Sequence, residues 1–571
     1  MKKPTFVPTP DLLETRIVLS GGPKFTSSSA AILTSHALGQ TYSQIEKAFV
    51  NFARHRQNYN ALEVNLATAV NRVPWNRRDG LLATVEAEPS AVRSDIASTV
   101  TKPVVTEMQN TVAELNDFVQ SSAPRPARSG NTAPSSPVRV LTASSPSPAT
   151  TIGSGTVTGP TGQANAVIVQ PADGKIVAAG IAPNSSGYGS FALARYNPDG
   201  TPDAGFGSDG QVVTTMSTSG SSIYGAAIQP DGMIVAVGDA VIAKTSGHSS
   251  SLGDEFAVAR YTTSGALDTT FGGTKGKNGK ITNAGEVFLS FGSGIDQARA
   301  VAFETVGGST EIVVAGWTNS VTGHPEVALA RYNSHGSLDT TFAGTGTVVT
   351  SIPNSSIAPS AYAVAVQPDG KIVVAGGTNG PGPYPAFLAR YNVNGSLDTT
   401  IGNHGLVVSQ FTSQDAFSGV AIQTDGKIVA VGAGAVGGNF VGEVARYNSD
   451  GTLDTTFGGG TGVVLNGAAG TQLNAVALQA NGQIVASGVA PNYETLVTRI
   501  NADGSLDTTY GSGGSVITAI GQLSQDNAVA IQPLDGEAVT AGFTSTTNVL
   551  WPNSHFLVSR YTTSGQLDTT F

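Results

Sequence analysis

The chain of 571 residues contains no cysteine. Without a thiol, the protein cannot form disulfides, attack a substrate with a thiolate or hold zinc through cysteine. The absence does not fix a cellular compartment, because reducing and oxidising compartments both tolerate cysteine-free proteins.

Charge is also scarce, since Asp, Glu, Lys and Arg make up only 12% of the chain. The net charge of −10 is unevenly distributed: residues 1–150 have a balance of +4, and residues 151–571 a balance of −14. An acidic body repels phosphate backbones, and no Lys/Arg cluster with interleaved aromatic residues is present. We therefore expect no nucleic-acid partner. No apolar run reaches about 18 residues, so we also expect no membrane-spanning helix.

The sequence lacks the common motifs of catalytic and metal-binding sites. The sequence has no HExxH, no Gly-x-Ser-x-Gly, no phosphate loop and no D-x-D-x-D-G loop for calcium. The Gly/Lys-rich residues 272–280 lack the phosphate-loop spacing, and the seven His residues are scattered. We predict no metal and no cofactor, and we assign no catalytic residue.

Glycine, in contrast, is abundant at 70 residues, and apolar residues make up 40% of the chain. This composition favours many short strands joined by tight turns. A chain of this length exceeds a single hydrophobic core, so we expect several folding units or a repeat array.

Three segments precede the repeats. Residues 1–29 are expected to be unstructured, although LLETRIVLS within them resembles a short LE-x-R-x-x-x-S segment of exported bacterial proteins. Apolar residues spaced by four and three predict a helical, coiled-coil-like hairpin over 30–120, either a spacer or a self-association element. Residues 121–149 are rich in Ser, Pro and Ala and are predicted to be a disordered linker.

From residue 150 to residue 571 the chain repeats two landmarks. One is QPDGKIVVAG at 367–376, and the other is ARYNSHGSLDTTF at 330–342, each with relatives along the chain. They define seven units, which we number 1 to 7. Each unit contains four strand-like stretches with an Asp-Gly or similar turn between the first and second.

Four antiparallel strands per repeat predict a mainly β protein, a seven-bladed β-propeller. Unit 7 ends at Phe571 without a fourth strand, whereas residues 150–158 precede unit 1 without a unit of their own. We expect the segment 155–158 to supply the outer strand of unit 7 and so to close the ring. The alternative is that the chain continues beyond Phe571.

In every unit the landmark Arg precedes the landmark Asp by eight positions. This fixed offset across a turn predicts a charge-assisted hydrogen bond that closes each blade, because other loop lengths vary widely. A ring of carboxylates around a ligand is the alternative, and seven equivalent places fit a structural role better. The pairs are Arg195 and Asp203, Arg260 and Asp268, Arg331 and Asp339, Arg390 and Asp398, Arg446 and Asp454, Arg499 and Asp507, and Arg560 and Asp568.

The connection between the second and third strands differs in every unit. In a propeller these connections would surround one mouth of the central channel, where aromatic and polar side chains recognise partners. Our binding-face candidates are Tyr188, His248, Asp254, Trp317, His324, Tyr384, Trp551 and His555.

The repeated unit resembles the delta-60 repeat of bacterial surface and secreted proteins. The resemblance covers residues 150–571, with departures at ETVGG in unit 3, TPDAGF in unit 1 and TRIN in unit 6. It implies a propeller outside the cell or at its surface, although a cytoplasmic location stays open, and it carries no catalytic residues. We expect a non-enzymatic propeller that binds a protein or a glycan. The alternative is a propeller hydrolase or lyase that uses loop His, Asp and Glu residues as acid and base.

Overall fold

The computed structural model describes residues 154–246, 249–275, 281–292, 294–319, 325–351, 358–379, 384–466, 469–547 and 553–571. The segments expected at 1–29, 30–120 and 121–149 lie outside the described residues. So do three of the binding-face candidates, His248, His324 and Trp551.

The described residues are almost entirely β-strand, with one 3-10 turn, η2 (Gly458–Gly460), and no α-helix among them. Consequently, nothing in this part of the chain is a helix long and apolar enough to cross a membrane.

The strands form four-stranded antiparallel groups that match the repeat units. Unit 1 contains β2 (Gln163–Val169), β3 (Ile176–Pro183), β4 (Gly189–Tyr196) and β5 (Gln211–Thr214). Unit 2 contains β6 (Ser221–Ile228), β7 (Ile234–Ser246), β8 (Ser249–Tyr261) and β11 (Glu286–Leu289), with a ribbon of β9 (Gly272–Lys275) and β10 (Ile281–Ala284). Unit 3 contains β12 (Asp296–Val306), β13 (Ser309–Thr318), β14 (Glu326–Tyr332) and β15 (Thr347–Thr350).

Unit 4 contains β16 (Ala358–Val366), β17 (Ile372–Asn379), β18 (Ala386–Tyr391) and β19 (Leu406–Ser409). Unit 5 contains β20 (Asp415–Ile422), β21 (Ile428–Val436), β22 (Asn439–Tyr447) and β23 (Val463–Asn466). Unit 6 contains β24 (Gln472–Leu478), β25 (Ile484–Ala490), β26 (Glu494–Ile500) and β27 (Ser515–Thr518). Unit 7 contains β28 (Leu523–Ile531), β29 (Ala538–Ser545), β30 (Ser554–Tyr561) and, from the other end of the repeat region, β1 (Thr156–Thr161).

Burial differs between the strands of a unit. The second and third strands are buried along almost their whole length, as in β25 and β18, whereas first strands such as β6 alternate buried and partly exposed residues. Middle strands are covered by neighbouring units on both faces, so they consist of continuous apolar runs such as IVAVG and IVVAG. Apolar clusters accordingly pair adjacent units, for example units 1 and 2.

The turn between the first and second strands explains the landmark QPDGK. In unit 4 the Gln367 amide donates to the Lys371 carbonyl at 2.8 Å, and the Gly370 amide donates to the Gln367 carbonyl at 2.9 Å. Gly370 has φ of +81°, which a residue without a Cβ adopts at little cost. The Asp369 carboxylate accepts a hydrogen bond from the Lys371 amide, so the Gln, Asp, Gly and Lys of the landmark all contribute to the turn.

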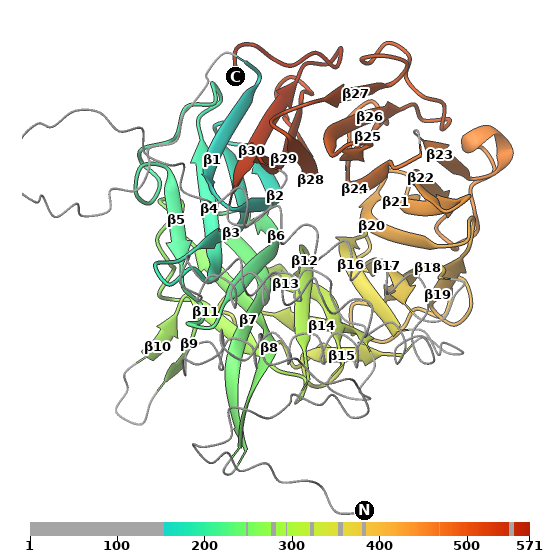
Figure 1. Ribbon diagram of the computed structural model, residues 1–571. Helices are drawn as coiled ribbons and strands as arrows, with labels where there is room; N and C mark the ends of the chain where they lie inside the picture. The colour runs from blue at the N-terminus through green and yellow to red at the C-terminus, as the bar shows by residue number, and fades with distance from the viewer. Residues whose placement is uncertain are drawn as a thin grey trace, which may run out of the picture. The chain divides into compact units, whose positions relative to one another are not determined.

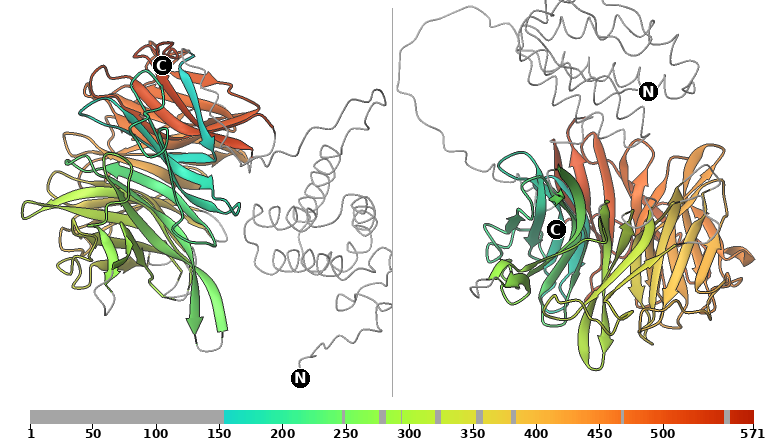
Figure 2. Two further views of the ribbon diagram at one scale, coloured as in Figure 1. Left: turned by 90° about the vertical axis from the view of Figure 1, so that its left-hand side faces the viewer. Right: turned by 90° about the horizontal axis from the view of Figure 1, so that it is seen from below.

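The groups are arranged around a common centre, with the first strand of each innermost (Figure 1). Units 4 and 5 are joined into one eight-stranded sheet by a single pairing between Gly377 and Ala416. The long β7–β8 hairpin extends beyond the neighbouring sheets (Figure 2).

The two ends of the repeat region meet in unit 7. Strand β1 runs antiparallel to β30, with Val157 opposite Val558. The Gly155 amide donates to the Phe571 carbonyl at 3.1 Å, and Val157 is fully buried in the core shared by units 7 and 1. The segment 155–158 therefore lies in the sheet where the sequence placed it.

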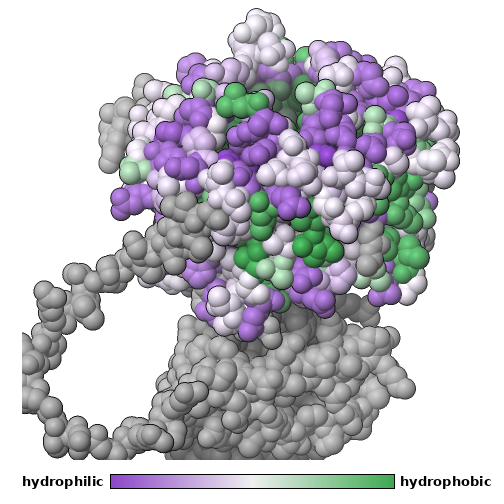
Figure 3. All heavy atoms as spheres, turned by 90° about the horizontal axis from the view of Figure 1, so that it is seen from above, coloured by the Kyte–Doolittle hydropathy of each residue, from purple (hydrophilic) through white to green (hydrophobic). Residues whose placement is uncertain are grey.

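Hydrophobic side chains on the outer wall form separate patches among hydrophilic ones (Figure 3). The short fourth strands also carry exposed apolar side chains: Val213, Val408, Leu465 and Ile517 are about half exposed.

Candidate functional site in the central channel

The Arg–Asp pairs form a repeated structural contact. In all seven units the Arg Nε donates to Oδ2 of the Asp eight residues later, at 2.6–2.8 Å. Both partners are buried in six of the pairs, and in unit 3 Arg331 is buried while Asp339 is partly exposed. In six units the other carboxylate oxygen accepts the amide and hydroxyl of a Thr two residues further on, as in Asp454 and Thr456. The hydroxyl of Thr509, together with the Arg499 guanidinium, lowers the pKa of Asp507 to about 2.

Each landmark Arg also reaches the next unit. Its Nη1 donates to a turn carbonyl one unit further along the chain, for example from Arg195 to Thr263 and from Arg446 to Ala502, at 2.5 Å in both. The series is cyclic, because Arg560 of unit 7 donates to Pro198 of unit 1 at 2.5 Å. The arginines therefore join each unit to the next. The Asp carboxylates accept hydrogen bonds from these arginines and from the nearby turn.

Unit 3 departs from the landmark without losing this contact. Glu304 stands where most other units have Gln and accepts Arg331 Nη1 at 2.8 Å, so Arg331 bonds two carboxylates. Burial raises the pKa of Glu304, and the Arg331 charge opposes that shift.

Five of the binding-face candidates are among the described residues, and each of the five belongs to a different unit. Tyr188 is 54% exposed, and His555 is exposed. Three candidates that were expected in loops lie in strands: Asp254 in β8, Trp317 in β13 and His555 in β30. The landmarks suggest that the second and third strands end earlier than they do. In unit 2 the pairing of β7 with β8 continues past the landmark, and Asp254 lies opposite Val241. Tyr384 lies before β18 and pairs with Gln414 of unit 5.

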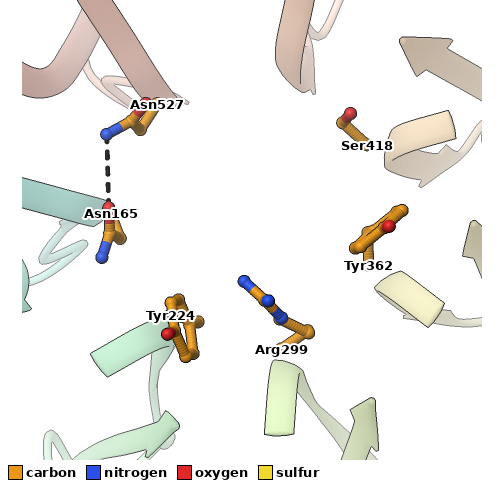
Figure 4. Close-up of a pocket in the computed structure, with 6 residues that line it drawn as sticks. All are labelled: Asn165, Tyr224, Arg299, Tyr362, Ser418 and Asn527. Atoms are coloured by element: carbon orange, nitrogen blue, oxygen red, sulfur yellow. Dashed lines mark hydrogen bonds between the residues drawn. The ribbon is translucent and has the colours of Figure 1, made fainter. Parts of the chain in front are cut away.

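A different set of residues faces the centre of the ring. Each first strand has a register irregularity at the same place, where one residue is left unpaired. Six of these bulged residues line a cavity of about 240 Å³ and project toward its open centre from six different strands (Figure 4). In unit order, the seven bulged residues are Asn165, Tyr224, Arg299, Tyr362, Ser418, Asn474 and Asn527; Asn474 is not among the lining residues.

The bulged residues are of two kinds. Where the residue is Asn, its amide donates to the carbonyl just before the bulge of the next unit: Asn165 to Ile223 at 2.7 Å, Asn474 to Asp526 at 2.8 Å and Asn527 to Ala164 at 2.9 Å. This bond braces units 1 to 2, 6 to 7 and 7 to 1. Among the described residues, the Tyr, Arg, Tyr and Ser of units 2 to 5 make no such bond.

Tyr224 and Arg299 are part of a polar chain at one side of the cavity. The Arg299 guanidinium lies over the Tyr224 ring, 4.1 Å from its centroid, and Arg299 Nη2 donates to Gln297 Oε1 at 2.8 Å. Gln297 Nε2 in turn donates to Asp239 Oδ2 at 2.8 Å. The guanidinium is therefore held in place by a ring and an amide.

Burial and, next, the negative charge of Asp254 raise the pKa of Asp239 to about 7, while Arg299 and the Gln297 hydrogen bond oppose the shift. Burial raises the pKa of Tyr224 to about 12, so its hydroxyl keeps its proton at neutral pH.

The cavity lies near the face that holds the connections between second and third strands. The bulged residues are the third to fifth residues of the first strands. First and second strands are antiparallel, so the start of each first strand lies beside the end of the second strand, where the connection to the third strand begins. We call this face the connection face.

The repeated landmarks do not point to the bulged residues, although the sequence does contain a signal for them. Each lies five positions before the Gln or Glu that opens the first turn, from Asn165 before Gln170 to Asn527 before Gln532. Identity varies at this offset while the flanking residues are mostly small or apolar. The strands were interpreted only as alternating patterns, and a bulge does not show in such a pattern.

The fold and its repeats are those of a β-propeller. A family model described as "Domain of unknown function (DUF5122) beta-propeller" matches residues 172–206, 229–271, 311–342, 367–400, 423–457 and 479–510. The segments fall in units 1 to 6 and show a propeller-type repeat.

None of the curated proteins matches this sequence. Solved structures that resemble the chain include Sqt1 of Chaetomium thermophilum, with 12% identity, a TM-score of 0.40 and coverage of 71% of this chain and 96% of that one. The polysaccharide lyase Uly1 is 12% identical, with a TM-score of 0.41 and coverage of 70% and 89%. Drosophila Semaphorin 2a is 8% identical, with a TM-score of 0.39 and coverage of 73% and 76%. At these values the likenesses do not point to a function.

Proposed function

We propose that this protein is a non-catalytic, seven-bladed β-propeller that binds a protein or a glycan partner at the connection face, with the channel cavity as the centre of the site. The observation that carries the proposal is the change at the bulged positions. A bracing Asn occupies three consecutive places around the ring, from unit 6 through unit 7 to unit 1, and Tyr, Arg, Tyr and Ser occupy the other four.

The residue types at the bulged positions differ in what they can do. An Asn at this position contributes a hydrogen bond between units, which is worth roughly 1 kcal/mol. Units 2 to 5 give up that bond and instead place two aromatic rings, a guanidinium and a hydroxyl around an opening. Aromatic rings and Arg are the side chains that most often dominate binding energy.

The N-terminal segments complete the proposal. The LLETRIVLS segment supports a place outside the cell or at its surface, and residues 121–149 would hold the propeller away from the helical region 30–120. That region would serve as a spacer or for self-association. The delta-60 repeat resemblance agrees with such a surface role.

A hydrolase or lyase is the second candidate, and Asp239 is the observation that favours it. A carboxyl group with a pKa of about 7 can donate or accept a proton at neutral pH. However, Asp239 is only 7% exposed and is not among the residues that line the cavity, which are two amides, two phenols, a guanidinium and a hydroxyl. Binding therefore has the stronger support.

The test is a screen of the full chain against purified glycans and candidate protein partners, with Tyr362→Ala beside the wild type. We expect at least one ligand to lose about tenfold or more in affinity, as when an interface aromatic is removed. Ile517→Ala, which changes an exposed side chain on the outer wall, should leave that affinity unchanged. Ligands that bind both variants like the wild type would contradict a site in the channel, and breakdown of a screened glycan would favour the enzyme.

A further inference from the structure

We propose that the channel cavity binds an acidic sugar residue, with Arg299 as the anchor for its carboxylate. The inference rests on the proposed binding function and names the chemistry of the same site.

Arg299 differs from every other arginine that the structure describes. Seven of those eight are the landmark residues, and each forms an ion pair with its Asp. Arg299 forms no ion pair with a described residue, and its only side-chain hydrogen bond to one goes to Gln297. A guanidinium has five N–H donors. The Nε–H is buried and has no partner among the described residues, so it is out of a ligand's reach, whereas Nη1 is unpaired and is not among the buried atoms.

An unpaired guanidinium N–H at a cavity gains a charge-assisted hydrogen bond when a ligand supplies the acceptor. A carboxylate suits the guanidinium because the planar fork of N–H groups matches its two oxygens. The position of the fork is preset, since stacking on Tyr224 and the bond to Gln297 restrict the side chain before a ligand arrives. Pre-organisation of this kind reduces the entropy lost on binding.

The neighbouring side chains favour a sugar over a bare carboxylate. Next to Arg299 around the cavity come Tyr362 and Ser418 (Figure 4), and neither hydroxyl forms a hydrogen bond with a described residue. This arc therefore offers one charged fork and two free hydroxyls. On the opposite side, the amides of Asn165 and Asn527 are already engaged in bracing bonds. A ring that carries both a carboxylate and hydroxyl groups would satisfy the whole arc.

The charge of the surroundings limits the kind of chain that can bind. Residues 151–571 carry a balance of −14, which repels a densely charged polyanion at long range. A glycan with isolated acidic residues, or one at its end, avoids most of that repulsion. A run of acidic amino acids does not, and it also lacks the hydroxyl groups.

Nearby carboxyls give the site a pH dependence. Asp239 faces Gln297 and Arg299 from β7, Asp254 lies close to it on β8, and the Tyr224 phenol stays neutral. Above a pH of about 7, Asp239 is charged and offsets part of the Arg299 charge; below it, that offset is lost. We expect the acidic ligand to bind more tightly at pH 6 than at pH 8.

The experiment uses the full chain and calorimetric titration with three probes: an oligosaccharide that ends in glucuronic acid, its neutral counterpart that ends in glucose, and an acidic peptide. The wild type should bind the first probe most tightly. Arg299→Met should weaken that binding by about 10- to 100-fold, as for lost hydrogen bonds to a charged group, and leave the neutral probe unchanged. Arg299→Lys should recover part of the affinity, because it restores the charge without the fork.

Equal binding of the acidic and neutral sugars, or an Arg299→Met variant that binds like the wild type, would overturn the inference. So would preferential binding of the peptide. Loss of the neutral sugar in Tyr362→Ala, without any effect of Arg299→Met, would uphold the proposed function while overturning this deeper claim. Thermal melting of each variant controls for folding, with Ile517→Ala as the matched outer-wall substitution.

Discussion

Replacing Glu443 by Gln should remove one component of the stability that the protein loses as pH rises. Glu443 lies in β22 and is fully buried. Neither of its carboxyl oxygens has a hydrogen-bond partner that meets the usual distance and angle among the described residues, and the nearby charge is that of another carboxyl, Asp415. The equivalent residues in the other units are all apolar: Ala192, Ala257, Ala328, Phe387, Leu496 and Leu557.

Burial, followed by the charge of Asp415, raises the pKa of Glu443 from 4.5 to about 9. The folded protein thus keeps a proton that the unfolded chain releases, so folding becomes less favourable as pH rises from 4.5 to about 9. The free energy of unfolding falls by about 1.4 kcal/mol per pH unit from this one group. Between pH 4.5 and neutrality the loss is about 3 kcal/mol. Gln has no proton to lose, so Glu443→Gln should lack this component.

Urea unfolding at a series of pH values between about 5 and 8 provides the assay. The free energy of unfolding of the wild type should fall more steeply with pH than that of Glu443→Gln, by about 1.4 kcal/mol per pH unit. Phe440→Gln, a substitution at an exposed position of the same strand, should keep the wild-type slope. Identical slopes in the wild type and Glu443→Gln would show that the buried carboxyl is ionised at neutral pH, and would refute the reasoning.

Three further predictions concern the ring. Arg499→Met should lower the free energy of unfolding by about 3–5 kcal/mol in urea titrations, because it leaves Asp507 buried without a cationic partner among the described residues and also removes the bond to Thr563; a loss below about 1 kcal/mol would contradict a buried pair. The pKa of Asp507, lowered to about 2, means that its contribution is complete above a pH of about 4 and is lost as pH falls through 2, so Asp507→Asn should flatten the acid limb of the stability profile. Asn527→Ala should cost about 1–2 kcal/mol and speed hydrogen exchange in β1 and β2 rather than in unit 4, because it removes the bracing bond to Ala164.

The strands of each unit can largely be predicted from the sequence because the same pattern recurs in all seven units. The stretches around residues 362–368, 371–376, 386–392 and 405–411 were expected to be the four strands of unit 4, and they correspond to β16 to β19. The eight-residue offset pointed to the contact between the landmark Arg and Asp, and the structure contains that contact in each unit. The second role of the Arg, toward the next unit, depends on how units stack, which no single repeat reveals.

The channel residues could not be obtained in the same way. Asn165 and Tyr224 occupy equivalent positions, yet one braces a neighbouring unit and the other faces an opening, and only the bulge in the register explains why either points inward. Trp317 and Asp254 were placed in loops because strand ends were judged from the landmarks. The β7–β8 ladder continues well beyond the landmark, since small and β-branched residues pair there as readily as they would form a loop.

The meeting of Gly155 and Phe571 has a consequence for protein engineering. Two positions more than 400 residues apart in sequence are adjacent in one sheet, so a short peptide could join them and new termini could be opened in a turn between two other units. Circular permutants of residues 154–571 made in this way would keep every inter-unit arginine bond, and the strand that now seals unit 7 would become an ordinary internal one.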